Sequence, residues 1–288
     1  MGESTRLTSE QQISVLEVLK RATGHLQKHG SDSPRLDSEV LLAYTLGVRR
    51  LDLYVQFDRL LTEPELARYR DLLARRARRE PVAYLVGHKE FMALDFEVSR
   101  DVLVPNPDTE VLVQRAVAIA REAGTPIRAA DVGTGSGCIA VALAHYAPNV
   151  EVWAGDVSEK ALEVAGRNVA KHGLAARVHL VCGDLMEPMP GEFDLVCANL
   201  PYVGEGAELP PEVTAQPAGA LFAAGDGSAV VMRLLEAAAQ RLRKEGRVLI
   251  EIDPAILEAT VSATEKSYAG HKVHRDLGGH ARVVEAWS

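Results

Sequence analysis

The segment Asn199-Leu200-Pro201-Tyr202 directly follows a run of apolar residues that predicts a buried strand. An asparagine side-chain oxygen and a neighbouring backbone carbonyl can accept the two protons of a planar amide or exocyclic amine, and an aromatic ring can pack against its flat face. Proline fixes its own backbone and keeps the preceding residue extended. An ordinary loop after a strand can have the same composition. In combination with the two motifs described next, the segment predicts methyl transfer to a planar nitrogen.

A glycine-rich loop lies between a predicted strand at 127–132 and a predicted helix at 138–146. It begins at Asp131 and contains Gly133, Thr134, Gly135, Ser136 and Gly137. Glycines let the backbone turn tightly and approach a ligand closely, and the N-terminus of the following helix favours a negatively charged group. A glycine-rich turn alone would be a weak indication. Its position between a strand and a helix predicts a nucleotide-like ligand.

Acidic residues follow the next two predicted strands. Asp156 lies at about the 20-residue spacing from the glycine loop at which an acid accepts hydrogen bonds from ribose hydroxyls in doubly wound folds. A helix cap or a simple turn is its alternative role. Asp184 and Leu185 follow the third strand, and an acid beside an apolar residue suits the amine and the ring face of an adenine.

These motifs need a scaffold that brings several strand ends together. From residue 107 onward, apolar runs alternate with helical periodicity, which is typical of a mostly parallel, doubly wound α/β sheet. Ligands bind outside the carboxyl ends of such strands, so the motifs are predicted to share one site. We expect strands at 127–132, 150–154, 178–182, 193–198 and 247–252, helices at 138–146, 158–172 and 229–242, and two final strands at 271–275 and 281–287.

The N-terminal part of the chain predicts helices. Ser9 fits the N-cap of a helix that ends near Gly30. The periodicity of a second helix at 34–46 places Leu36, Val40 and Tyr44 on its apolar face.

A third helix begins at Thr62, which has capping-box spacing to Glu65 and precedes an apolar stripe of Leu66, Tyr69, Leu72 and Leu73. Apolar residues from 90 to 104 predict two short strands. We therefore expect a helical substrate-recognition domain at 1–85, a linking β-hairpin at 86–106 and a catalytic domain at 107–288.

The composition of the 288-residue chain is that of an ordinary globular protein, with 47% hydrophobic and 25% charged residues. No apolar stretch approaches the ~20 residues that span a bilayer, and the polar N-terminus does not resemble a secretion signal. Three cysteines in apolar segments, Cys138, Cys182 and Cys197, predict buried reduced thiols in a cytoplasmic protein. The net charge of -8 argues against stable nucleic-acid binding.

Other polar clusters carry weaker signals. His25 and His29 share a helix face, and His271 and His274 a strand, but neither pair has a third ligand in register. We therefore expect solvated faces and no metal site. The six arginines between 68 and 79 fit a solvated helix face or a surface for an acidic partner or RNA: Arg68, Arg70, Arg75, Arg76, Arg78 and Arg79.

Over nearly its whole length, the sequence resembles the class I S-adenosylmethionine-dependent methyltransferases, and among them the peptide chain release factor glutamine methyltransferases. Besides the glycine loop and the segment at 199–202, the resemblance rests on Ser33-Pro-Arg-Leu-Asp-Ser-Glu39, Glu80-Pro-Val-Ala-Tyr-Leu-Val-Gly87, Phe91, Val102-Leu-Val-Pro105, Pro107-Asp-Thr-Glu110, Ala220-Leu-Phe222, Gly225-Asp-Gly227 and Asp276-Leu277.

The resemblance implies a Rossmann-like methyltransferase that uses S-adenosyl-L-methionine, releases S-adenosyl-L-homocysteine and needs no metal. The substrate would be the glutamine of the Gly-Gly-Gln motif in class 1 release factors. Catalytic roles fall to Asn199, Pro201 and Tyr202, with Leu200 also binding substrate. Cofactor binding falls to Gly133, Thr134, Gly135, Ser136, Gly137, Asp156, Asp184, Leu185 and Asn199.

The sequence departs from the family pattern at a few positions. Leu200 replaces the first proline of Asn-Pro-Pro-Tyr, Asn106 replaces an arginine, Gln216 a glutamate and His280 an arginine. Leucine at 200 resembles adenine dimethylases, so N6-adenine methylation is an alternative. A ribosomal-protein glutamine methyltransferase and a non-catalytic relative are others. An NAD-dependent dehydrogenase would leave Asn199 unexplained.

Overall fold

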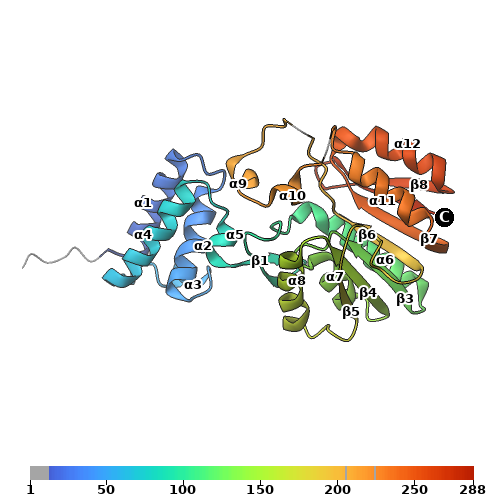
Figure 1. Cartoon of the computed structure of the whole chain (residues 1–288). Helices are drawn as coiled ribbons and strands as arrows, with labels where there is room; N and C mark the ends of the chain where they lie inside the picture. The colour runs from blue at the N-terminus through green and yellow to red at the C-terminus, as the bar shows by residue number, and fades with distance from the viewer. Residues whose placement is uncertain (1–12, 205, 224) are drawn as a thin grey trace, which may run out of the picture. The chain divides into compact units, whose positions relative to one another are not determined.

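The computed structural model describes residues 13–204, 206–223 and 225–288. The chain divides into two compact units, Met1–Val86 and Gly87–Ser288. In the described part of the first unit the helices are α1 (Val15–Lys28), α2 (Pro34–Leu46), α3 (Asp52–Val55), α4 (Glu63–Ala77) and α5 (Val82–Val86), as Figure 1 shows. No helix among the described residues is long and apolar enough to cross a membrane.

The N-cap of α1 differs from the predicted one. Ser14 caps this helix, and its hydroxyl accepts a hydrogen bond from the backbone N–H of Glu17. Ser9 lies outside the described residues. The predicted end is confirmed, because Gly30 follows the C-cap with a φ of 78°.

The predicted apolar face of α2 is wrong, although the bounds of the helix are confirmed. Leu36 and Tyr44 are 43% and 38% exposed. Asp37 is instead turned inward, where Arg76 of α4 donates to its carboxylate at 2.8 Å. The buried face of α2 thus combines this ion pair with apolar residues outside the predicted stripe, such as the fully buried Leu41. The same pair removes Arg76 from the solvated arginine face that the sequence predicted for α4.

The start of α4 agrees with the prediction. Thr62 and Glu65 form the capping box, with the Glu65 carboxylate accepting from the Thr62 backbone N–H at 2.8 Å. Leu66, Tyr69 and Leu72 are buried along this helix and belong to the core of the first unit.

The second unit begins with a hairpin of β1 (His88–Phe91) and β2 (Leu94–Glu97). The prediction that strand structure continues to Val104 is wrong. The chain turns at Ser99, whose backbone carbonyl accepts from the Val102 N–H at 3.3 Å. The buried side chain of Asn168 hydrogen-bonds both the backbone N–H and the carbonyl of Glu97. The same amide group donates to the carbonyl of Ser136, so it ties the hairpin to the glycine loop.

The predicted, mostly parallel sheet is confirmed. Its order is β5-β4-β3-β6-β7-β9-β8, with β9 antiparallel to both β7 and β8. The strands are β3 (Ile127–Val132), β4 (Val150–Asp156), β5 (Val178–Cys182), β6 (Phe193–Ala198), β7 (Leu242–Glu251), β8 (Gly270–Arg275) and β9 (Ala281–Trp287).

Helices cover both faces of this sheet (Figure 1). In β6, Leu195 packs in an apolar cluster with α6 (Glu110–Ala123), α7 (Cys138–Tyr146) and α8 (Glu159–Lys171). Its neighbour Val196 packs in a second cluster with α11 (Ala229–Ala239) and α12 (Leu257–Ser267). Alternate residues of a buried parallel strand thus serve two cores. Short helices complete the unit: η1 (Pro107–Thr109), α9 (Pro211–Thr214), α10 (Ala218–Leu221) and η2 (Pro254–Ile256).

The cysteines differ in exposure. Cys197 is buried and Cys138 is half-buried, but Cys182 is exposed, which corrects the prediction of three buried thiols. Cys182 is the last residue of the edge strand β5, where the sheet no longer covers it.

A buried carboxylate on β9 gathers three cationic side chains. Arg115 of α6, Arg247 of β7 and His274 of β8 all hydrogen-bond Glu285, whose side chain is 1% exposed. Burial alone would raise the pKa of Glu285, but these hydrogen bonds outweigh it and lower the pKa to about 2. His274 therefore belongs to this half-buried cluster, not to the solvated strand face that the sequence predicted.

Candidate active site

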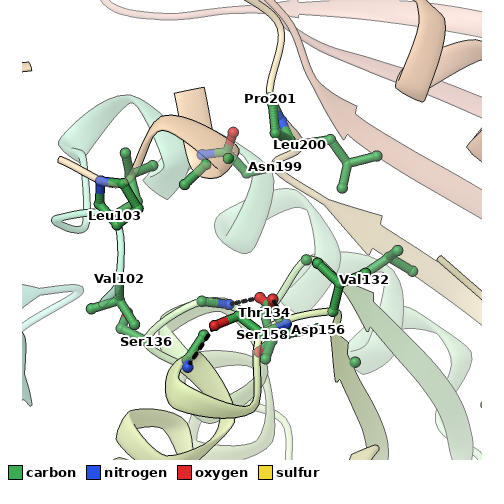
Figure 2. A pocket seen from close by; sticks show the side chains of 18 of the residues that line it. Val102, Leu103, Val132, Thr134, Ser136, Asp156, Ser158, Asn199, Leu200 and Pro201 are labelled. Carbon is green, nitrogen blue, oxygen red and sulfur yellow. Dashed lines mark hydrogen bonds between the residues drawn. The ribbon is translucent and has the colours of Figure 1, made fainter. Parts of the chain in front are cut away.

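A cavity of about 440 Å³ opens at the carboxyl ends of the parallel strands. Figure 2 shows Asn199 and Pro201 on one side of it and Asp156 and Ser158 on the opposite side. Most of the predicted site residues line this cavity: Gly133, Thr134, Gly135, Ser136, Asp156, Asp184, Leu185, Asn199, Leu200 and Pro201. Two predicted residues, Gly137 and Tyr202, are not part of the lining.

The glycine loop has the conformation that its sequence requires. Gly133, Gly135 and Gly137 have φ values of 74°, 53° and 80°, a region that side chains with a Cβ rarely adopt. Gly137 caps α7, and a Cβ there would lie 3.2 Å from the Cβ of Ala165 in α8. Gly137 therefore supports the loop by allowing the start of α7 to pack closely against α8.

Asp131 holds the two ends of this loop together, a role that the sequence analysis did not assign. Its buried carboxylate accepts from the Thr134 hydroxyl at 2.6 Å and from the Ala140 backbone N–H at 3.1 Å. Burial raises the pKa of Asp131 to about 7. In the sequence, the feature that could have indicated this role is an acidic residue two positions before the first glycine of the loop.

Asp156, the last residue of the neighbouring strand β4, hydrogen-bonds the glycine loop. Its carboxylate accepts from the backbone N–H of Gly135 and of Ser158, both at 2.9 Å. The cap of α8 is Ser158, whose hydroxyl accepts from the Ala161 N–H. Asp156 thus lies at the cavity wall and is not the helix cap.

We expect Asp156→Ala to weaken binding of S-adenosyl-L-methionine by about ten- to a hundred-fold. A hydrogen bond from a ribose hydroxyl to a carboxylate contributes roughly 1.5–3 kcal/mol, and the substitution also releases Gly135. Isothermal titration calorimetry measures the affinity, with Asp71→Ala at an exposed position of α4 as the matched control. Parent-like affinity in a folded Asp156→Ala variant would rule out the ribose role.

The proposed adenine end of the cavity carries one ion pair. Asp184 pairs with Arg233 of α11, and both side chains are half exposed. Leu185 is nearly buried and has a φ of 46°. The ion pair orients the carboxylate beside an apolar wall.

Contacts with neighbouring elements hold the segment at 199–202, which follows β6. The side-chain Nδ2 of Asn199 donates to the Thr109 hydroxyl at 3.1 Å, so the Oδ1 end can serve as an acceptor. Leu200 is buried, and its Cδ2 lies 2.8 Å from the position that a Cβ on Gly133 would take. Tyr202 turns away from the cavity lining, and its hydroxyl lies 3.4 Å from Oε1 of Glu251.

Glu251 is the second residue that sequence reasoning missed. It ends β7 and is 1% exposed. Burial raises its pKa to about 7 and Asp108 adds to this effect, while a hydrogen bond from Thr109 and the charge of Arg282 oppose it. A glutamate within the apolar run of a central strand was the signal that could have identified it.

The departures from the family pattern have local roles here. The Asn106 side chain accepts from the Asp108 N–H at 3.1 Å and begins η1. Gln216 accepts from the Val104 N–H at 2.9 Å, which joins the segments on either side of the cavity mouth.

Gly227 is buried behind the site, and a Cβ there would lie 2.1 Å from the carbonyl oxygen of Tyr202.

Among the described residues, the histidine pair on α1 is not part of a metal-binding cluster. The ring centroids of His25 and His29 lie 4.3 Å apart, with the ring planes tilted by 43°. Across 13–204, 206–223 and 225–288, no group of three or more His, Cys, Asp or Glu side chains could hold a metal ion.

The strand order, the antiparallel β9 and the glycine loop define a class I methyltransferase fold. The chain superimposes on the hMettl16 catalytic domain with a TM-score of 0.56 and 17% identity over 80% of this chain and 84% of that one. It superimposes on a methyltransferase from Pyrococcus furiosus with a TM-score of 0.52 and 21% identity over 74% and 98%.

Sequence comparison identifies the family. Residues 17–87 match the PrmC N-terminal domain, and residues 107–259 match the methyltransferase small domain. The release factor glutamine methyltransferase of Geobacter sulfurreducens is 40% identical over 94% of this chain and 95% of its own length. That of Moorella thermoacetica is 38% identical over 96% and 99%. The chain belongs to the release factor glutamine methyltransferase family, as its motifs predicted.

Proposed function

We propose that this chain transfers a methyl group from S-adenosyl-L-methionine to the side-chain amide nitrogen of the glutamine in the Gly-Gly-Gln motif of class 1 release factors. One observation carries the proposal. Asn199, whose side-chain Nδ2 donates to the Thr109 hydroxyl, lines the same cavity as the glycine loop and Asp156. In our proposal, an amide clamp and a nucleotide site therefore share one cavity.

The residues present fit the cofactor. A volume of about 440 Å³ lies within the range of small-molecule sites. When bound, S-adenosyl-L-methionine supplies an electrophilic methyl group on sulfur. In our proposal the glycine loop, with Thr134 and Ser136, holds the methionine part, Asp156 accepts from the ribose, and Asp184 with Leu185 contacts the adenine. Gly137 supports the loop, and the reaction needs no metal ion.

The proposed chemistry depends on alignment. An amide nitrogen is a poor nucleophile because its lone pair is delocalised, so the site must orient it and favour the charge that develops on it. Asn199 Oδ1 and the carbonyl of Leu200 or Pro201 would accept the two amide protons. Tyr202 lies outside the cavity lining in this structure, so a contact with the substrate would require its ring to turn toward the cavity.

We further propose that the helical domain at 1–85 selects the protein partner and that the hairpin at 86–106 links it to the catalytic domain at 107–288. The match of residues 17–87 to the PrmC N-terminal domain supports this division. The place of action would be the cytoplasm, where release factors work, and stable nucleic-acid binding is not part of the proposal.

The test is a parallel incubation of the chain with labelled S-adenosyl-L-methionine and three purified substrates: a release factor, a ribosomal protein and RNA. We expect label on the release factor, none on a release factor whose motif glutamine is alanine, and slower labelling of a short Gly-Gly-Gln peptide. Label on the ribosomal protein or the alanine variant would overturn the substrate assignment.

A second candidate, N6-methylation of adenine, is favoured by Leu200, which gives an Asn-Leu-Pro-Tyr segment. The same clamp can accept the protons of an exocyclic amine. Label on RNA without label on release factor would support this candidate in place of the first.

A further inference from the structure

One wall of the cavity belongs to a segment at 206–220, which we call the wall loop. It contains α9 and most of α10 (Figure 1), and its residues Pro217, Gly219 and Ala220 line the cavity. None of the residues from 206 to 220 is buried. Segments that bury few apolar groups open at a lower free energy than the core of a fold, so the wall loop can open while the sheet stays folded.

The C-terminal end of the wall loop is fixed by a parallel bridge between Val203 and Phe222. The Val203 N–H donates to the Leu221 carbonyl at 3.1 Å, and the Ala223 N–H donates to the Val203 carbonyl at 2.9 Å. Leu221 and Ala223 are buried, unlike the loop itself. The chain therefore leaves this point at Val203 and returns to it at Phe222. A long connection whose ends lie close together is typical of the lids of active sites.

Gln216 joins the wall loop to a second segment of the cavity lining. Its side-chain oxygen accepts from the Val104 N–H at 2.9 Å, and its NH₂ group donates to the Glu212 carbonyl at 3.4 Å. A backbone N–H only donates and a carbonyl only accepts, so one orientation of the Gln216 amide satisfies both partners. On either side of Val104, Leu103 and Pro105 line the cavity, as Figure 2 shows for Leu103.

We propose that Gln216 is a positioning residue that holds the wall loop against the segment at 102–106 and thereby sets how fast the cavity exchanges its ligand. This inference rests on the proposed function, because it takes the ligand to be S-adenosyl-L-methionine or its product. Neither Gln216 nor Val104 is part of the cavity lining. Their hydrogen bond therefore acts on the opening of the loop and not through contacts with the ligand. Lid opening and product release limit the turnover of many enzymes.

The test measures association and dissociation of S-adenosyl-L-homocysteine by surface plasmon resonance for the parent, Gln216→Met and Gln216→Glu. Methionine keeps the length of glutamine but removes both hydrogen bonds. We expect both rate constants to rise about fivefold, the loss of about one hydrogen bond, with the dissociation constant within about twofold of the parent. Glutamate, which the family pattern has here, keeps an acceptor for the Val104 N–H and should change the rates less than about twofold.

The matched control is Gln114→Met, at an exposed position of α6, which should match the parent in both rates. Parent-like rates in Gln216→Met would overturn the inference. A faster dissociation with an equal loss of affinity would also overturn it, because that result indicates a lost contact with the ligand. If the parent binds neither S-adenosyl-L-homocysteine nor S-adenosyl-L-methionine, the cofactor assignment of the proposed function fails instead.

Hydrogen exchange of the Val104 backbone amide tests the same hydrogen bond without any ligand. In the parent and in Gln216→Glu this N–H has an acceptor, and in Gln216→Met we expect it to exchange about fivefold faster. The Ala223 N–H, in the bridge at the end of the loop, should exchange equally in all three proteins. Equal exchange of the Val104 amide in all three proteins would contradict the inference, whatever the rates of ligand binding.

Discussion

Replacing Asn199 by alanine is expected to slow single-turnover methyl transfer to a release factor by about two orders of magnitude. The substitution removes the acceptor that would align the glutamine amide, and misplacing a reacting group costs about this much. Cofactor affinity should change far less, because the glycine loop, Asp156 and Asp184 remain in the cavity lining.

Quenched-flow measurement of the labelled release factor gives the rate, and calorimetry gives the cofactor affinity separately. Asn149→Ala is the matched control, since this asparagine hydrogen-bonds the carbonyls of Ala120 and Thr125 away from the cavity. Transfer by Asn199→Ala at the parent rate would show that the amide clamp is wrong.

The second large effect is on stability. Glu285→Gln is expected to lower the free energy of unfolding by about 3 kcal/mol at pH 7, the equivalent of a pKa lowered from 4.5 to about 2 in a buried group. It would leave Arg115, Arg247 and His274 around an uncharged amide. Because the folded-state pKa is depressed, this stabilisation is present above pH 4.5 and is lost as the pH falls through about 2.

Urea unfolding followed by tryptophan fluorescence reports on the second unit, which contains Glu285. Both tryptophans of the chain, Trp153 and Trp287, lie in that unit. The difference between the parent and Glu285→Gln should shrink as the pH approaches 2. Glu265→Gln, at an exposed position of α12, should match the parent throughout. A difference that stays constant from pH 7 to pH 3 would mean that ionisation of Glu285 does not contribute to stability.

The strands of the sheet could be predicted from sequence because a strand that is buried on both faces is apolar at most of its positions. Ile127–Val132 and Phe193–Ala198 have the predicted bounds for that reason. The buried face of α2 was not predicted, because it includes Asp37, whose burial is explained only by its ion pair with Arg76, 39 residues away in sequence. The contact between Asn168 and the backbone of Glu97 joins residues that are 71 positions apart, and it could not be predicted either.

Most of the candidate site follows from one topological rule, that parallel strands place their carboxyl ends together. The rule brings Gly133, Asp156 and Asn199 to one cavity. It says nothing about residues that act from beneath the cavity floor, such as Asp131 and Glu251. These two acids are distinguished by pKa values that burial raises, and burial depends on the whole fold.

Gly227 shows how a position can constrain the backbone of the active site without lining the cavity. It lies in a turn that a survey of cavity residues would overlook, yet its φ of 93° and the carbonyl oxygen of Tyr202 leave no room for a side chain. Any Cβ there must push the backbone of the segment at 199–202. In a mutational scan, substitutions of Gly227 are expected to reduce activity as substitutions of active-site residues do, although Gly227 lies in a loop. For interpreting variants of this family, closeness of one backbone to another is therefore as informative as closeness to the substrate.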